Sequence, residues 1–544
     1  MSGRALFRIL AIYALVLVLV GLAVDLGFTL TPTVPFVVAS QYARGERVAR
    51  AIDGTGVEEV AVAEGPLARN PVLFALGLVP GRDGVRAELD GKVAFATVDD
   101  LYASGAYDHA WVWSEQSFGF GVHRETVLAI LAAQMNVPAR DLRERATFRR
   151  IRFEHRNLTP PITPAALTPE LVRARVVEAA THLARDVGAD GRFRYLVDAP
   201  TNKTLHSGYN WPRHSGSTFF LAQAAAFLDD PFVRYAALRA AARLRDDTMR
   251  DCGANRCIAS DDGSTIADIG SSALALVAFT EIVRTGADGA YRPALVELAA
   301  FLRSQQRPDG EMIHFYDRTR KAPLDLPALY YTGEATLALA RSFTVTRDPR
   351  DLAASQSALR YLAGAGWSFF GSRYYYGEEH WTCQAVAELW DHAPDPDALA
   401  FCARWHVYQR RLQQGPDDSP FDGDGAFNFG PIASPRVTPA SSRGEAAAAL
   451  LDVLLRERAA GHAANDLASV DDELRRALAF VLRQQLSPGP AYLFADPVAV
   501  RGAVPGSPVD TLLRIDYAQH AGSMMIRWLQ IQSRRELEPT PPTR

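Results

Sequence analysis

Acidic side chains occur at several points in the second half of this 544-residue chain, in positions suited to glycoside hydrolysis. That reaction uses two carboxyl groups that face each other across the bond, one as the acid and one as the base or nucleophile. We predict that Glu334 acts together with either Glu379 or Asp516. Further carboxylates of the same kind are Asp268, Glu378 and Glu445. The alternative for each is a helix cap, because acidic residues are favoured in first turns.

Imidazole, phenol, amide and guanidinium groups form a second set, which is typical of proton transfer at a sugar carbon. In uronate epimerisation or elimination, an amide and a guanidinium neutralise the sugar carboxylate while a histidine or tyrosine removes the C5 proton. His214 and Tyr517 are the predicted acid–base residues. The predicted substrate-binding residues are Asn210, Trp211, Arg213, Asp268, Tyr331, His380, Trp381 and His520. The alternative is a polar clasp that closes the fold.

These residues stand at the openings of six apolar, alanine-rich helical segments that begin near 214, 268, 333, 380, 443 and 517. Six segments with charged faces alternate with them, at about 168–187, 231–248, 291–306, 351–364, 395–413 and 471–486. Outer and inner helices alternating six times predict an (α/α)6 toroid over residues 168–535, and an irregular α-solenoid is the alternative. Parallel inner helices would bring all six openings to one mouth.

Long loops precede these openings, and loops of this length are usually functional in a compact domain. Their aromatic residues offer flat faces for stacking on sugar rings. They are Trp211, Tyr374, Tyr375, Tyr376, Trp381, Phe427 and Phe429. The first and last inner helices are neighbours in a closed ring, so we predict that Asp516 lies within direct or one-water reach of Arg213 or His214. Glu334 is predicted to line the same cavity from across the ring.

The N-terminal part has a different character. Arg4 and Arg8 precede an apolar run, which predicts a single-pass transmembrane anchor over residues 1–31 with the body outside the cytoplasm. A cleaved signal peptide and a buried core helix are the alternatives. Residues 32–60 read as a proline-containing linker, and residues 61–156 as a small α+β domain with a hairpin at Asp90-Gly91. We expect the inner membrane as the location and the membrane as a partner through this helix.

The net charge and the cysteine content limit which classes of partner and which compartment the sequence favours. The net charge of −4 argues against nucleic acid, and hydrophobic content of 48% is ordinary for a globular protein. The four cysteines suit an exported protein, with Cys252 and Cys257 as a local disulfide and Cys383 and Cys402 as a possible second one. Free thiols and a metal site are the alternatives. No zinc-type spacing, phosphate loop or dinucleotide fingerprint is present, so we predict neither a metal nor a cofactor.

Three motifs carry a resemblance to a known group of proteins. They are Tyr-Asn-Trp-x-Arg-His-Ser-Gly-Ser at 209–217, Leu-Tyr-Tyr-Thr-Gly-Glu-Ala at 329–335 and Arg-Ile-Asp-Tyr-Ala-Gln-His at 514–520. They resemble motifs of bacterial six-hairpin (α/α)6 toroid proteins, distantly like D-glucuronyl C5-epimerases, unsaturated glucuronyl hydrolases and uronate lyases. The zinc-binding lanthionine cyclases share the toroid, but their Cys-His-Gly ligand motif is missing here.

The resemblance implies a polysaccharide or oligosaccharide as the partner. We therefore expect a mainly α, membrane-anchored, extracytoplasmic protein, and first a glycoside hydrolase acting on an envelope or extracellular polysaccharide. A uronate C5-epimerase or polysaccharide lyase is the alternative within the fold. A non-catalytic glycan-binding or envelope-assembly protein is the alternative outside enzymology.

Overall fold

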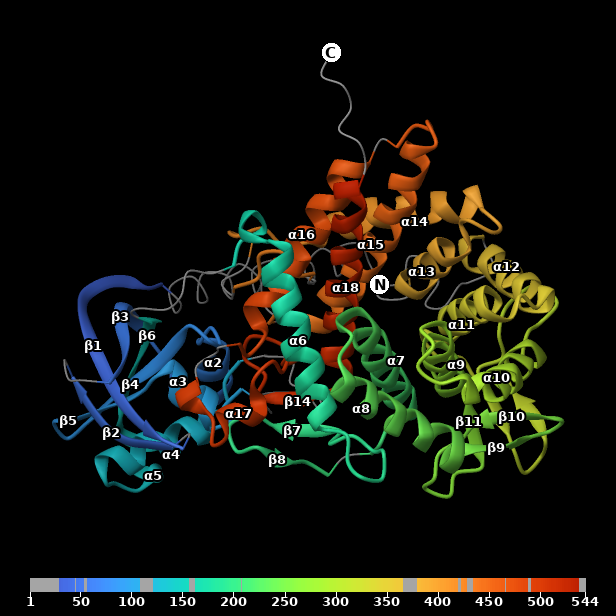
Figure 1. The fold of residues 1–544 in the computed structure, drawn as a ribbon. Helices are drawn as coiled ribbons and strands as arrows, with labels where there is room; N and C mark the ends of the chain where they lie inside the picture. The colour runs from blue at the N-terminus through green and yellow to red at the C-terminus, as the bar shows by residue number, and fades with distance from the viewer. Residues whose placement is uncertain are drawn as a thin grey trace, which may run out of the picture.

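The computed structural model describes residues 29–44, 46–52, 56–107, 121–155, 162–206, 208–364, 379–418, 422–427, 434–464, 466–487 and 491–537. Residues 1–28, where most of the predicted anchor falls, lie outside this set, so the anchor stays a prediction. Within the set, no helix is long and apolar enough to span a bilayer. A strand-rich N-terminal part lies beside a larger helical part (Figure 1).

An antiparallel sheet forms the core of the N-terminal part. Its strands in the described residues are β1 (Thr31–Ala43), β2 (Glu46–Ile52), β3 (Val57–Pro66), β4 (Asp83–Leu89), β5 (Lys92–Ala96) and β6 (Thr147–His155), in the order β2-β1-β3-β6-β4-β5. The accompanying helices are α2 (Pro71–Leu76), α3 (Val98–Ala103), α4 (Arg124–Met135) and α5 (Ala139–Arg145). The hairpin prediction is confirmed, because Leu89 pairs with Lys92 while Asp90 and Gly91 both have positive φ.

The predicted linker over residues 32–60 is wrong. These residues contribute β1, β2 and the start of β3, and β1 pairs with both of the other two strands. The prolines that suggested a linker fall where the β1–β3 ladder is irregular, between Pro32 and Phe36. A residue without an N–H group is tolerated at such an irregularity, so proline content alone did not exclude a strand.

The helical part is a ring of helix pairs. Within the described residues, the inner helices are α7 (Trp211–Leu228), α9 (Ile269–Arg284), α11 (Tyr331–Thr346), α13 (Glu379–Leu389), α15 (Val437–Ala459) and α18 (Ile515–Leu537). The outer helices are α6 (Pro169–Arg185), α8 (Pro231–Ala242), α10 (Arg292–Ser304), α12 (Pro349–Ala363), α14 (Pro396–Arg410) and α16 (Leu467–Gln484). Each inner helix packs on the next, and α18 packs on α7, which closes the toroid (Figure 1).

Side-chain pattern explains which helices lie inside. Every residue of α9 from 269 to 282 is buried, as expected for a helix covered on all sides. The outer helix α10 buries only one stripe, including Leu295, Leu298 and Leu302. Small residues let the inner helices approach closely: a Cβ atom on Gly522 of α18 would lie 2.1 Å from the ring of Phe220 on α7. The predicted alternation is confirmed, although α15 begins earlier than predicted, at Val437.

Short elements at the rim lead into the inner helices. β14 (Leu512–Arg514) pairs with β7 (Leu196–Asp198) directly before α18, and β11 (Ile266–Asp268) pairs with β12 (Phe315–Asp317) directly before α9. These ladders fix the direction in which each inner helix starts. The other short elements are β8 (Lys203–Thr204), β9 (Met249–Cys252), β10 (Asn255–Ile258), β13 (Ala322–Leu324), α17 (Pro497–Val500), the turns η1 (Pro164–Ala166), η3 (Gly289–Tyr291) and η5 (Ala491–Leu493), and the π-helical η2 (Arg243–Thr248).

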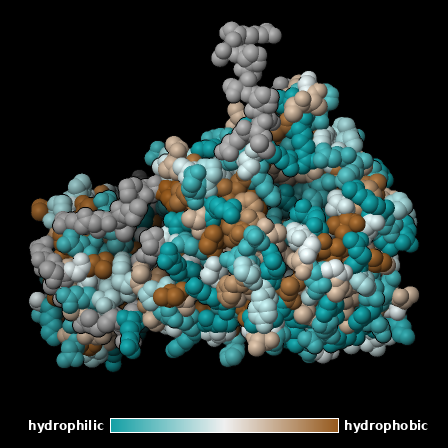
Figure 2. All heavy atoms as spheres, in the orientation of Figure 1, coloured by the Kyte–Doolittle hydropathy of each residue, from teal (hydrophilic) through white to brown (hydrophobic). Residues whose placement is uncertain are grey.

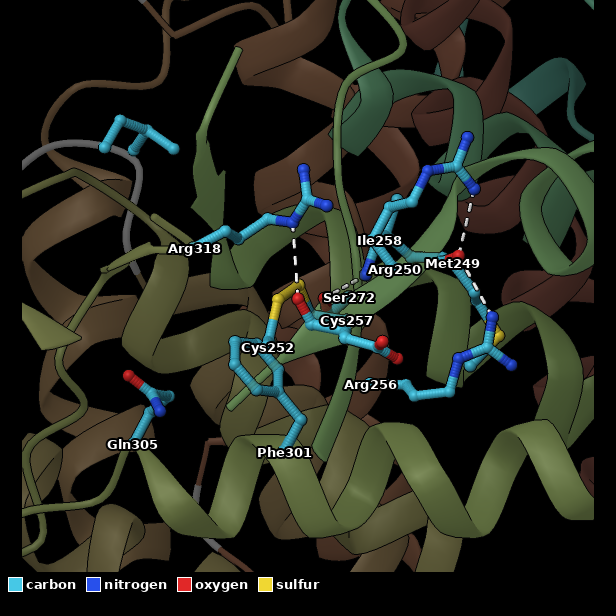
Figure 3. The surroundings of a disulfide bond; sticks show 12 residues. Met249, Arg250, Cys252, Arg256, Cys257, Ile258, Ser272, Phe301, Gln305 and Arg318 are labelled. Atoms are coloured by element: carbon cyan, nitrogen blue, oxygen red, sulfur yellow. Dashed lines mark hydrogen bonds between the residues drawn. A yellow bond between two sulfur atoms is a disulfide. The ribbon is translucent and has the colours of Figure 1, made fainter. Parts of the chain in front are cut away.

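Both cysteine pairs are disulfide-bonded. Cys252 and Cys257 join across the β9–β10 hairpin, with Cα atoms 5.9 Å apart (Figure 3). Cys383 on inner helix α13 joins Cys402 on outer helix α14, with Cα atoms 5.8 Å apart. The disulfide prediction is therefore confirmed for both pairs. On the face drawn in Figure 2, hydrophobic residues occur in small groups among hydrophilic ones, as on most protein surfaces.

Candidate functional site

Two histidines and a glutamate from three inner helices meet inside the toroid. His380 comes from α13, Glu445 from α15 and His520 from α18. Nδ1 of His520 lies 2.8 Å from Oε2 of Glu445. The two imidazole rings are edge to face with centroids 5.5 Å apart, and Trp381 lies 5.7 Å from the His520 ring. We call His380, Glu445 and His520 the His–Glu cluster.

Hydrogen bonding determines what the His–Glu cluster can do. A carboxylate can only accept, so Nδ1 of His520 donates to Glu445 and leaves Nε2 as the basic nitrogen. Glu445 is fully buried, and its Oε1 atom has no hydrogen-bond partner among the described residues. The side chain of His520 keeps 12% exposure. An imidazole oriented by a buried carboxylate, with a second imidazole beside it, is suited to proton transfer.

The same atoms are also suited to a metal ion. One ligand atom from each of the three residues lies within 4.8 Å of the other two. Two histidines and one glutamate form a ligand set that zinc accepts in proteins. The donors therefore fit either an acid–base pair or a metal centre, although the cysteine spacing alone had predicted no metal.

The predicted contact between the first and last inner helices is confirmed. Nε of Arg213 lies 3.4 Å from Oδ2 of Asp516. Nε and Nη2 of Arg514 also donate hydrogen bonds to the two carboxylate oxygens of Asp516, at 2.6 and 2.9 Å. Burial acts to raise the pKa of Asp516, but Arg514 and Arg213 outweigh it and hold that pKa at about 2. This geometry is that of the polar clasp.

His214 is a structural histidine, so its predicted acid–base role is not supported. Its Nδ1 accepts from the Tyr209 hydroxyl at 2.7 Å, and its Nε2 donates to the Ala240 carbonyl at 3.0 Å. The side chain is fully buried, and burial lowers its pKa to about 4. With both nitrogens engaged inside the fold, neither is left for a substrate.

Tyr517 is also engaged by residues of the fold, so the contacts do not support its predicted catalytic role. Its hydroxyl accepts from Arg436 at 3.3 Å, and its ring packs under Arg514 and against Gly506. Burial raises the pKa of Tyr517 to about 12. Asp516 and Tyr517 are adjacent on α18, so their side chains point in different directions and meet different partners.

Several predicted binding residues are helix caps. Asn210 accepts from the Arg213 N–H group at 3.0 Å and begins α7, while Asp268 accepts from Ser271 at 2.7 Å and begins α9. Burial raises the pKa of Asp268. Trp211 is buried against His214, with ring centroids 5.1 Å apart. Each of these residues therefore has a structural partner at the start of an inner helix.

Tyr331 and Glu334 lie against the start of α9. A Cβ atom on Gly270 would lie 2.4 Å from the Tyr331 ring and 2.6 Å from Glu334 Oε2, so glycine makes room for both. Burial, then the Asp268 and Glu334 carboxylates, raises the pKa of Tyr331. Glu334 is 5% exposed. Its place across the ring from Asp516 in one cavity stays a prediction.

Some predicted residues are not described. The side chain of Glu379, and the whole of Glu378, Tyr374, Tyr375, Tyr376 and Phe429, lie outside the described part of the structure. Phe427 is described and is buried beside Arg443, so it does not offer a stacking face. From the sequence, His380 and His520 were predicted only as substrate-binding residues. Glu445 was predicted only as one of several carboxylates at the starts of inner helices. The signal that unites them is their position on three consecutive inner helices.

Comparisons with known proteins agree with the fold. No family model matches the chain, and no curated protein matches it. A sugar epimerase from a ruminal bacterium is 11% identical over 67% of this chain and 99% of that chain, with a TM-score of 0.50. Cellobiose 2-epimerase from Spirochaeta thermophila (14% identity, 68% and 100%, TM-score 0.49) and an unsaturated glucuronyl hydrolase specific for heparin (12% identity, 67% and 99%, TM-score 0.49) are also similar. The predicted resemblance to six-hairpin toroid proteins is confirmed at the level of the fold.

Proposed function

We propose that this protein is a carbohydrate-modifying enzyme that transfers protons at a sugar carbon, as in epimerisation. The observation that carries the proposal is the His–Glu cluster, in which Glu445 orients His520 at 2.8 Å beside His380. Epimerisation next to a carbonyl removes a proton from one face of a carbon and returns one to the other face. Two neighbouring imidazoles supply a base and an acid for these steps. The sugar epimerase with the same fold supports the substrate class.

Each residue has a defined part in the proposed reaction. Nε2 of His520 removes the proton, and the Glu445 carboxylate stabilises the imidazolium that forms. His380 returns a proton from the other face. Trp381 packs on His380 with centroids 4.3 Å apart, and Tyr330 lies edge-on to the same ring. Trp381 is buried and holds the His380 ring in place, whereas Tyr330 is 38% exposed and offers a face on which a sugar ring would stack.

The glycoside hydrolase prediction has weaker support when Asp516 is one of its two carboxylates, and the pair of Glu334 and Glu379 stays a prediction because the Glu379 side chain lies outside the described residues. It needs two carboxyl groups free to meet a glycosidic bond. Both oxygens of Asp516 accept from Arg514, and Asp516 closes the ring with Arg213. The uronate form of the epimerase is also weaker, because Asn210 is a cap and Arg213 belongs to the clasp. We therefore propose a sugar epimerase or isomerase without requiring a uronate.

Solvent exchange tests the reaction. The purified chain is incubated in D2O with neutral sugars, uronates and envelope oligosaccharides, and deuterium in the sugars is followed by NMR. His520→Ala and His380→Ala should abolish exchange, and Glu445→Gln should lower kcat about 10²–10⁴-fold. His462→Gln is the matched control, because His462 makes a similar 2.7 Å contact with Glu457 at an exposed position.

Three outcomes would count against the proposal. Release of new reducing ends without exchange would favour the hydrolase. Activity that a chelator removes and zinc restores would favour a metal centre at the His–Glu cluster. Retention of glycans without turnover, unaffected by His520→Ala, would favour a non-catalytic binding protein.

We also propose that the body of the protein lies outside the cytoplasm, held by the N-terminal apolar run. The two disulfides support an oxidising compartment. A C-terminal reporter that is active only in the cytoplasm should stay silent in cells. A strong reporter signal, or four free thiols in protein trapped with an alkylating agent at lysis, would contradict this location.

A further inference from the structure

A second group of ligand-type side chains lies where the N-terminal sheet meets the toroid. Glu59 comes from β3, Asp99 from α3 and His155 from β6. One ligand atom from each lies within 4.8 Å of the other two. Glu59 is fully buried and Asp99 is 3% exposed, while the side chain of His155 keeps 21% exposure. This junction cluster is separate from the His–Glu cluster and independent of the proposed reaction.

The protein holds one oxygen of each carboxylate and leaves the other for the junction cluster. Oδ2 of Asp99 accepts from the Tyr492 hydroxyl at 2.8 Å, and Oδ1 lies 3.0 Å from Nε2 of His155. Oε1 of Glu59 accepts from the Asp99 N–H group at 3.2 Å. Oε2 of Glu59 is buried without a hydrogen-bond partner among the described residues. A buried carboxylate oxygen left in this way needs a positive partner.

The balance of charge in the junction cluster also favours a bound cation. In the described ranges, no arginine or lysine pairs with Glu59 or Asp99, so one imidazole faces two buried carboxylates. The cluster therefore tolerates a second negative charge poorly unless a cation neutralises it.

We propose that Glu59, Asp99 and His155 bind a divalent transition-metal ion of the Zn²⁺ or Mn²⁺ class at the junction. Two carboxylates and an imidazole suit such ions better than Ca²⁺ or Mg²⁺, which prefer oxygen ligands alone. The 3.0 Å between Asp99 Oδ1 and His155 Nε2 matches adjacent ligands of an octahedral ion with bonds of about 2.1 Å, and a tetrahedral ion would need them about 3.4 Å apart. The partly exposed His155 provides a route for the ion and for water ligands.

The ion would fasten the two parts of the molecule. Tyr492, which orients Asp99, belongs to η5 of the toroid part, and its ring packs on Tyr42 of β1 with centroids 5.0 Å apart. A hydrogen bond to a metal-binding carboxylate fixes its direction and raises metal affinity. Metal binding at Asp99 and docking of the η5 segment therefore reinforce each other.

The test is metal binding by the full chain after chelator treatment. Zn²⁺ and Mn²⁺ are titrated separately by calorimetry, and metal content is measured after gel filtration. Glu59→Gln and His155→Ala should each lose about one equivalent of bound ion. Glu58→Gln on the same strand is the matched control, and Glu445→Gln identifies any ion held by the His–Glu cluster. Tyr492→Phe should weaken binding about 10–100-fold without removing it.

Thermal unfolding provides the second measurement. Glu59→Gln without metal should be at least as stable as the native chain, because an unpaired buried carboxylate is removed. In a Glu445→Gln background, which removes any ion at the His–Glu cluster, added Zn²⁺ or Mn²⁺ should raise Tm, and adding Glu59→Gln or His155→Ala should abolish this rise. The proposal is overturned if the native chain binds neither ion beyond the amount retained by both junction variants. It is also overturned if Glu58→Gln loses binding to the same extent.

Discussion

Replacing Asp516 by asparagine should destabilise the toroid by about 3–5 kcal/mol at neutral pH, because a buried arginine loses its partner. Arg514 is 7% exposed and grips both oxygens of Asp516, and Arg213 adds a contact at 3.4 Å. An amide cannot accept two charge-assisted hydrogen bonds in the same way. The clasp joins the first and last inner helices, so its loss weakens closure of the ring.

The pH dependence gives an independent magnitude. The pKa of Asp516 is about 2 in the folded chain and about 3.9 in an unfolded chain, a difference worth about 3 kcal/mol. Because the folded pKa is the lower one, this stability is present above about pH 4. It is lost as the pH falls from about 4 to about 2. Asp516→Asn should remove this part of the acid dependence.

Urea unfolding followed by circular dichroism measures both effects. Asp229→Asn is the matched control, since Asp229 pairs with Arg234 at 2.8 Å but its side chain is 91% exposed. An exposed pair of this kind is worth at most about 1 kcal/mol. The clasp interpretation is refuted if Asp516→Asn unfolds at the same urea concentration as Asp229→Asn. Lost turnover with unchanged stability would instead return Asp516 to the catalytic residues.

Three further predictions concern the fold. Gly522→Ala should cost about 1–3 kcal/mol by overpacking against Phe220, whereas Gly289→Ala, with nothing within 4 Å of the new Cβ atom, should be near neutral in the same urea assay. Cys402→Ala should cost about 3 kcal/mol and Cys252→Ala about 2 kcal/mol, because their disulfides span 19 and 5 residues; equal Tm values for the two variants would contradict this ranking. Burial holds His214 neutral with a pKa of about 4, below about 6.5 when unfolded, so native stability should fall by about 1.4 kcal/mol per pH unit between pH 6.5 and 4. His214→Phe should reduce that slope in unfolding measured across this range, and an unchanged slope would show that His214 titrates normally.

The alternation of inner and outer helices could be predicted from the sequence because the burial of a helix determines the pattern of its apolar residues. A helix covered on all sides, such as α9, is apolar throughout, while an outer helix such as α10 is apolar along one stripe. The contact between Arg213 and Asp516 followed from ring closure alone. The strands of residues 32–60 could not be predicted in the same way, because Pro32 and Pro35 suggested a linker. The β1–β3 pairing accommodates them where its register is irregular.

The roles of individual histidines were decided by tertiary structure. His214 and His520 both stand near the start of an inner helix, and the sequence around each is rich in small and polar residues. Only packing places His214 between Tyr209 and the Ala240 carbonyl and leaves His520 against Glu445. A local pattern specifies that a helix forms and which face is apolar. It does not specify which distant helix supplies the hydrogen-bond partner, and that partner determines whether an imidazole is structural or free to react.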